Sequence, residues 1–233
     1  MHLMIRRISA VVLTMVCLAL TAATPSSPPQ KADARLSPKA ELLMRTYRTN
    51  ANIEAKLEAL RGLEKYRGAA VDEFLLLEYG KLDGAKQPDA RLLGGMLRLW
   101  AMHPDRTVLP YLVYEGLFHE DAEVVRASAV GIAQLSEDAK ALMSTGTAAR
   151  GSDPAEELAA DLIHRLGERA ELLPPIEKVL ALWTGKMRPG YKPNADLKRK
   201  VGEQERDLAL EFWKTWFEQR FNRKLKPPDA PAK

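Results

Sequence analysis

The feature of this sequence that most restricts its fold is a helical repeat of apolar residues that is interrupted at short, regular intervals. From residue 37 to about residue 220, apolar residues recur every three or four positions, and breaks occur after roughly ten to sixteen residues. The breaks carry Pro, Gly or Asp, as at Ser37-Pro38 and Asp153-Pro154, which favour helix ends. No convincing strand alternation occurs. The sequence therefore predicts an all-α fold of about nine or ten helices.

The breaks also predict where each helix lies. We expect helices at 38–49, from 53 to the glycine at 68, around 71–77, between the prolines at 88 and 104, at 105–117, 121–135, from 136, 153–166, 174–183, and from 198 or 203 to 220. Each of these helices is short and has one apolar stripe, which it cannot bury alone. Neighbouring helices must therefore stack, and the pattern favours an α-solenoid of antiparallel helix pairs.

The N-terminus has the organisation of a secretory signal peptide. Arg6 and Arg7 precede an almost wholly apolar run over residues 8–20, and small residues follow up to Ala23. The run is shorter than the roughly 20 residues that span a bilayer. We expect cleavage near Ala23, a periplasmic or secreted protein, and no transmembrane span afterwards; the export route stays open.

Cleavage would leave a chain with neither disulfide nor thiol chemistry. The only cysteine, Cys17, lies within residues 1–23. Residues 24–36 are rich in Pro and Ser and read as a flexible linker, and residues 226–233 read as a disordered tail. Between them we expect a repeat domain at 37–183, then a basic loop and a Trp-rich capping helix at 184–225.

One segment of the repeat domain carries a family resemblance. Residues 109–135 read LPYLVYEGLFHEDAEVVRASAVGIAQL. The segment resembles a HEAT repeat: its first helix is similar to LPxLxxxL, and its second is similar to DxxVRxxAxxxL, with Asp121 as the cap and Val124 as the first buried residue. The family's Arg after that valine is replaced by Val125. The resemblance implies a HEAT-like solenoid, with three to four pairs over residues 38–183.

The C-terminal part carries a second resemblance. Residues 182–221 are similar to a closing segment of secreted bacterial HEAT-repeat proteins, in which LTGxxxGY leads to a helix ending in WxxWF. Gly190 and Tyr191 match the first motif, and Trp213, Trp216 and Phe217 match the second. Some proteins with this segment are joined to c-type haem modules, but this chain has no CxxCH motif. We therefore expect no cofactor.

The aromatic residues of the last helix are the first candidate site. Trp213, Trp216 and Phe217 are spaced i, i+3 and i+4 and share one helical face. They could form a docking surface for a partner, since aromatic residues dominate interface hot spots. The favoured interpretation is that the helix caps the solenoid and buries this stripe.

The basic loop is the second candidate site. Residues 186–226 contain twelve basic and six acidic residues, whereas residues 24–185 contain twenty basic and twenty-four acidic ones. The candidate partner-binding residues of the loop are Tyr191, Lys192, Lys198, Arg199 and Lys200. A basic surface suits an anionic membrane, an acidic polymer or an acidic protein. We expect no nucleic acid as partner of an exported protein. The alternative is a solvated charged loop.

The sequence shows no pattern for catalysis or metal binding. His103, His119 and His164 lack the spacing of metal ligands, no GxSxG occurs, and Gly94-Gly95 lacks the context of a phosphate loop and is expected to allow close helix packing. The leading hypothesis is a non-catalytic scaffold for protein–protein interaction in the cell envelope. The alternatives are a HEAT-like lyase or enzyme accessory and a peripheral binder of anionic surfaces.

Overall fold

The computed structural model describes residues 37–66, 68–145, 153–193 and 195–226. Within them the chain forms ten α-helices and no strand, which confirms the all-α prediction. The helices are α2 (Pro38–Thr49), α3 (Ile53–Leu63), α4 (Ala69–Asp83), α5 (Ala90–Met102), α6 (Leu109–Tyr111), α7 (Ala122–Gln134), α8 (Ser136–Thr145), α9 (Pro154–Glu168), α10 (Leu173–Thr184) and α11 (Glu203–Phe221). A π-helix, η1 (Leu112–Gly116), follows α6, and a 3₁₀ turn, η2 (Ala170–Leu172), precedes α10. The predicted signal peptide at 1–23, the linker at 24–36 and the tail beyond Lys226 lie outside the described residues.

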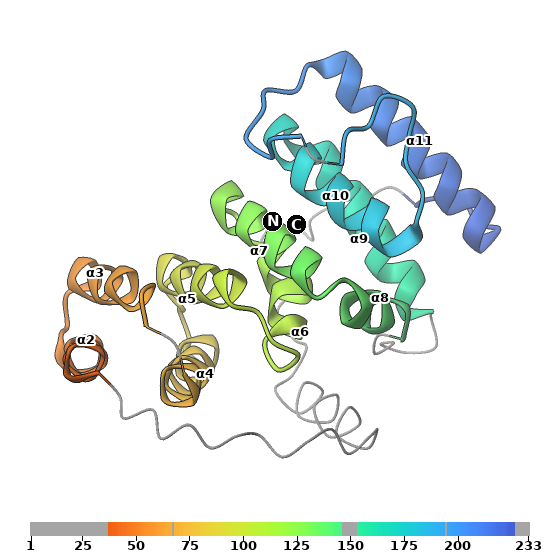
Figure 1. Ribbon diagram of the computed structural model, residues 1–233. Coiled ribbons are helices and arrows are strands. Elements are labelled where there is room, and N and C mark those ends of the chain that lie inside the picture. The colour runs from red at the N-terminus through yellow and green to blue at the C-terminus, as the bar shows by residue number, and fades with distance from the viewer. Residues whose placement is uncertain (1–36, 67, 146–152, 194, 227–233) are drawn as a thin grey trace.

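The helices are arranged in two rows over most of the molecule (Figure 1). Helices α3, α5, α7 and α10 follow one another in one row, and each contacts the next. In the other row, α2 lies against α3, α4 against α5, and η1 against α7. Towards the C-terminus, α8 and α9 both pack on α10, and α11 packs on α9. Successive helices therefore bury their stripes against neighbours in sequence.

Two adjacent glycines allow α5 to lie close to both of its neighbours in the row. A Cβ atom on Gly94 would lie 2.9 Å from the ring of His119, and one on Gly95 would lie 3.0 Å from Leu60 of α3. The expectation that this pair permits close packing is confirmed. The ring of His119 is half-buried, and its Nδ1 accepts the backbone N–H of Asp121 at 3.0 Å. Its Nε2–H therefore donates to the carbonyl of Ala90 at 2.9 Å, so His119 joins α5 to the start of α7.

Three local predictions differ from the structure. Gly68 does not end the second helix: α3 stops at Leu63, and Gly68 precedes α4 with a φ of 132°, a conformation open to glycine because it lacks a Cβ atom. Ser37 stands at the N-cap of α2, but its side chain makes no capping hydrogen bond. Asp105 accepts the N–H groups of Thr107 and Val108, yet the segment that follows winds into α6 and the π-helix η1 rather than one regular helix.

Arg165 of α9 and Arg169, which follows the end of this helix, attach the C-terminal helices to the turn between η1 and α7. Arg165 donates to the carbonyl of His119, and Arg169 donates to the carbonyl of Glu120 at 2.5 Å. The backbone carbonyls at this turn have no partner inside the preceding helix, so arginine side chains can satisfy them. These bonds hold α9 in place as the support for α11.

Substitution by Ala is expected to have opposite effects on stability at two glycines. Gly131 lies at the contact between α5 and α7, whereas Gly80 lies on α4 and has no close neighbour. Gly131→Ala is expected to lower the free energy of unfolding by roughly 1–2 kcal/mol, because the new Cβ would lie 2.9 Å from backbone atoms of Ala101, which cannot rotate away. Gly80→Ala, on α4, meets nothing within 4 Å and is expected to stabilise by about 0.5–1 kcal/mol through helix propensity. Urea unfolding followed by circular dichroism measures both. A Gly131→Ala protein as stable as Gly80→Ala would contradict close contact of the two helices.

Candidate partner-binding surface at the C-terminal end

The segment between α10 and α11, of which residues 185–193 and 195–202 are described, contacts both helices. Helix α10 ends at Gly185 in the left-handed conformation, with a φ of 68°, which is the usual glycine stop. The hydroxyl of Thr184 accepts the N–H of Lys186 at 3.1 Å. A second left-handed glycine, Gly190, allows a turn that the N–H of Tyr191 closes onto the carbonyl of Arg188 at 3.1 Å. These turns aim the side chain of Arg188 inward.

Arg188 and Glu177 form a buried ion pair that the sequence did not reveal. The side chain of Glu177, on α10, is 0% exposed and that of Arg188 is 6% exposed. The guanidinium donates to both carboxylate oxygens of Glu177, at 2.6 and 3.2 Å. Burial raises the pKa of Glu177, while the hydrogen bonds and the charge of Arg188 oppose that rise. The pair fixes the loop to α10.

The network extends from Arg188 to the first turn of α11. Arg188 also donates to Glu205 at 2.5 Å, and Arg199 donates to both oxygens of the same carboxylate at 2.8 and 2.6 Å. The hydrogen bonds from Arg199, followed by those from Arg188, lower the pKa of Glu205 to about 2 despite its partial burial. Two arginines of the basic loop are thus neutralised within the protein.

The other predicted residues of the loop have different surroundings. Lys192, Lys198 and Lys200 are exposed, and the ammonium of Lys198 lies 3.6 Å from the carboxylate of Glu123 on α7. Tyr191 is half-buried and borders a hollow of only about 10 Å³, the size of a single water molecule. Burial, then the charge of Glu177, raises the pKa of Tyr191 to about 12. The loop therefore presents lysines, but it has no room there for a small-molecule ligand.

The aromatic stripe of α11 divides into a buried and an accessible part. Trp213 is 0% exposed and Phe217 is 2% exposed, so both side chains are packed inside the protein in this structure. Trp216 is half-buried and lies edge-on to Trp183 of α10, with ring centroids 6.4 Å apart. The indole N–H of Trp183 in turn donates to Ser144 of α8 at 3.1 Å. The stripe joins α11 to the helices beneath it and leaves one face of Trp216 at the surface.

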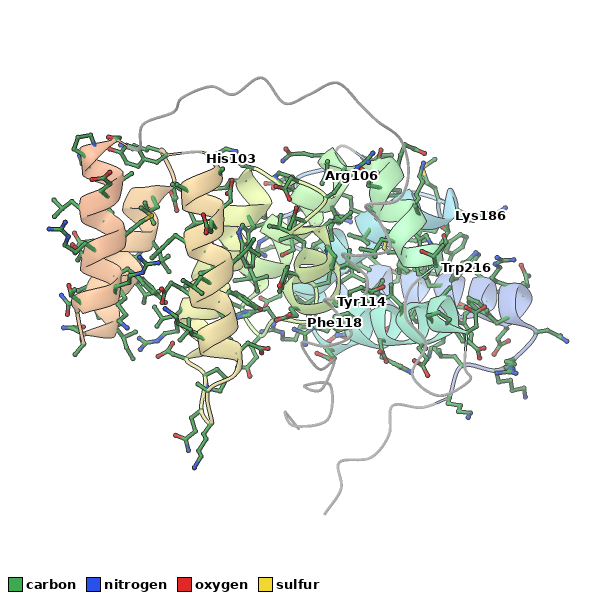
Figure 2. All side chains as sticks on the ribbon, turned by 90° about the horizontal axis from the view of Figure 1, so that it is seen from below. His103, Arg106, Tyr114, Phe118, Lys186 and Trp216 are labelled. Atoms are coloured by element: carbon green, nitrogen blue, oxygen red, sulfur yellow. The ribbon has the colours of Figure 1, made fainter. Side chains whose placement is uncertain are left out.

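The accessible part of Trp216 belongs to an open groove of about 420 Å³ along α11. We name it the α11 groove; it is lined by Lys186, Leu208, Glu211, Phe212, Thr215, Trp216 and Gln219. Lys186 and Trp216 lie together at the end of the molecule away from α2 (Figure 2). Sequence reasoning missed Leu208, although the spacing of 208, 212, 215 and 219 is that of one helical face.

A second cluster that sequence reasoning missed lies at the π-helix. Glu115 of η1 is mostly buried and accepts a hydrogen bond from the hydroxyl of Tyr79 on α4. The rings of Tyr79, Trp100 and Tyr111 pack with centroids 5.0 to 5.2 Å apart, which leaves no space between them for a ligand. Burial raises the pKa of Glu115 to about 7, the hydrogen bond from Tyr79 opposes this rise, and the charge of Asp83 adds to it.

The raised pKa of Glu115 predicts a protein that loses stability as the pH rises from about 4.5 to 7. Over this range the folded protein holds a proton that the unfolded chain releases, so each step up in pH favours unfolding, by at most about 3 kcal/mol in total. Glu115→Gln should remove this component of the pH dependence. Tyr79→Phe removes the hydrogen bond that lowers the pKa of Glu115, so the loss of stability should extend to higher pH. Urea unfolding at a series of pH values tests this; a Glu115→Gln profile parallel to that of the wild type would contradict it.

Two further properties bear on the kind of site available. The described residues contain no group of three or more His, Cys, Asp and Glu side chains placed to hold a metal ion. Among the helices of the described ranges, none is both long enough and apolar enough to cross a membrane. Comparison of the chain with protein-family models, with curated proteins and with solved structures found no match.

Proposed function

We propose that this protein is an exported, non-catalytic scaffold that binds a protein partner in the cell envelope, and that its helices form a HEAT-like α-solenoid. The observation that carries the proposal is the unbroken contact from α3 through α5 and α7 to α10, with a second helix beside each of the first three. Stacking of this kind produces an extended surface on one side of the row, which repeat proteins use for binding.

The side of the row turned away from α2, α4 and η1 is the best candidate for that surface. Met102 of α5 and Val130 of α7, two helices of this row, are each 44% exposed. An ion pair of 2.8 Å between Arg91 and Glu54 links α5 to α3 on the same row. At the other end, Lys198 reaches Glu123 of α7, so the surface continues into the basic loop. Exposed apolar residues on helices that also carry exposed charges suit a protein partner.

Capture of a partner from an envelope extract by the exported protein tests the proposal. We expect one or more proteins to be retained above background at about physiological salt, and Met102→Asp/Val130→Asp to lose them. Leu77→Asp is the matched control, because Leu77 is 51% exposed on α4 in the other row. Recovery of nothing above background at several salt concentrations would count against a scaffold, and equal loss in the control would count against this surface.

Export itself is tested by the N-terminus of the protein recovered from the producing cells. The proposal rests on the positive charge of Arg6 and Arg7, the apolar run after them and the small residues up to Ala23. We expect a mature chain that starts near Thr24 and lies outside the cytoplasm. A full-length chain retained in the cytoplasm would refute export.

A further inference from the structure

The outward face of α11 carries an acidic stripe next to the α11 groove. At 100° per residue, positions 207, 211 and 218 fall in one sector, beside that of 208, 212, 215 and 219. The stripe consists of Asp207, Glu211 and Glu218, all exposed. Within the described residues Glu211 and Glu218 form no ion pair, and Asp207 has only a 3.8 Å contact with Arg206. Lys214 falls in the same sector, between Glu211 and Glu218 along the helix, so the stripe has three acids and one base.

The sequence suggested a basic C-terminal end, but charge is distributed differently on this surface. Arg188 and Arg199 are held by Glu177 and Glu205, and Lys198 lies against α7. The acids of α11, in contrast, point into solvent. The edge of the α11 groove along this helix is therefore acidic, and the opposite edge is formed by the loop at Lys186.

The floor of the α11 groove is apolar and accessible. Leu208, one of its lining residues, is 55% exposed. Phe212 and Trp216 complete the floor, and aromatic residues of this kind are frequent binding hot spots. From Leu208 to Gln219 the groove follows α11 for roughly 16 Å, the length of about three helical turns.

We propose that the α11 groove binds an amphipathic helix of a partner protein whose apolar face is bordered by Lys and Arg. Its apolar residues, spaced i, i+3, i+4 and i+7, would rest on Leu208, Phe212 and Trp216. Its basic edge would lie along the acidic stripe, where opposite charges favour the complex and set its orientation. This inference rests on the proposed function, because it names the kind of protein segment that the scaffold holds.

A second copy of this chain fits the α11 groove less well. In an antiparallel pair of identical helices the same edge of each helix meets, so this stripe, with three acids and one base, would face the same stripe of the other copy. Like charges placed together across an interface disfavour association. The charge pattern thus selects a basic partner over self-association.

Two synthetic peptides of about 18 residues, roughly 27 Å long as helices, test the proposal. Both carry Leu at i, i+3, i+4 and i+7, and their remaining positions are Lys in one peptide and Glu in the other. Fluorescence anisotropy of the labelled peptides is measured with the exported protein at about 0.15 M salt. We expect the Lys peptide to bind at least about tenfold more tightly than the Glu peptide.

Matched variants locate the binding. Leu208→Ser and Glu211→Lys should each lower the affinity of the protein for the Lys peptide by at least about fivefold. Leu77→Ser and Glu73→Lys, at exposed positions of α4, should leave it unchanged. Equal binding of the two peptides, or wild-type affinity in Leu208→Ser, overturns the assignment. Capture from the envelope extract uses other variants, so the scaffold proposal can fail or hold independently of this result.

Discussion

Arg188→Met is expected to lower the free energy of unfolding by about 3–5 kcal/mol. The substitution keeps most of the aliphatic volume but removes the cation that lies 2.6 Å from a fully buried carboxylate, that of Glu177. An unpaired buried charge keeps its desolvation cost without the compensating attraction. Chemical denaturation at neutral pH, followed by far-ultraviolet circular dichroism, gives the value.

The double variant Glu177→Leu/Arg188→Met separates the charge from the packing. Apolar residues of similar volume can replace a buried ion pair at little cost, so the double variant should regain most of the lost stability. Arg199→Met is the matched control, since Arg199 and Glu205 are 28% and 31% exposed, and we expect it to cost no more than about 1 kcal/mol. A double variant as unstable as Arg188→Met would show that the arginine acts through its packing instead.

Trp213→Ala is expected to have an effect of similar size, about 3–5 kcal/mol. The indole is fully buried and packs edge-on to Phe212 and Trp216, with centroids 5.1 and 5.8 Å away. Its removal leaves a cavity where α11 packs on the neighbouring helices. Circular dichroism should follow this unfolding, because the substitution removes a fluorophore.

Trp216→Ala provides the comparison within the same stripe. Trp216 is only half-buried, so less apolar surface returns to water and the loss should be roughly half as large. If α11 caps the row of helices, Trp213→Ala should also lower the slope of the free energy of unfolding against denaturant concentration. In that case α11 would unfold before the other helices. Equal losses for Trp213 and Trp216 would contradict the division of the stripe into buried and accessible parts.

The sequence by itself determined which segments are helical, because the signals that start and stop a helix are local. Asp121 and Asp153 accept backbone N–H groups two residues ahead, as their positions suggested. Gly185 ends α10 because it can adopt the left-handed conformation. Where the local signal was ambiguous the prediction failed. A glycine such as Gly68 can stand at either end of a helix, and no residue pattern in 105–117 predicts the π-helix η1.

Only the tertiary structure decided what each stripe and each charge faces, because those partners lie far apart along the chain. The spacing of Trp213, Trp216 and Phe217 places all three on one face, but the angle of α11 against α9 and α10 buries two and leaves Trp216 at the edge. The sequence of the loop predicts a basic patch, but in the structure the path of the loop places Arg188 in an ion pair with Glu177. Besides the side of the row turned away from α2, α4 and η1, the α11 groove with its acidic edge is therefore a candidate surface, because tertiary packing neutralises the arginines and leaves the carboxylates of α11 in solvent.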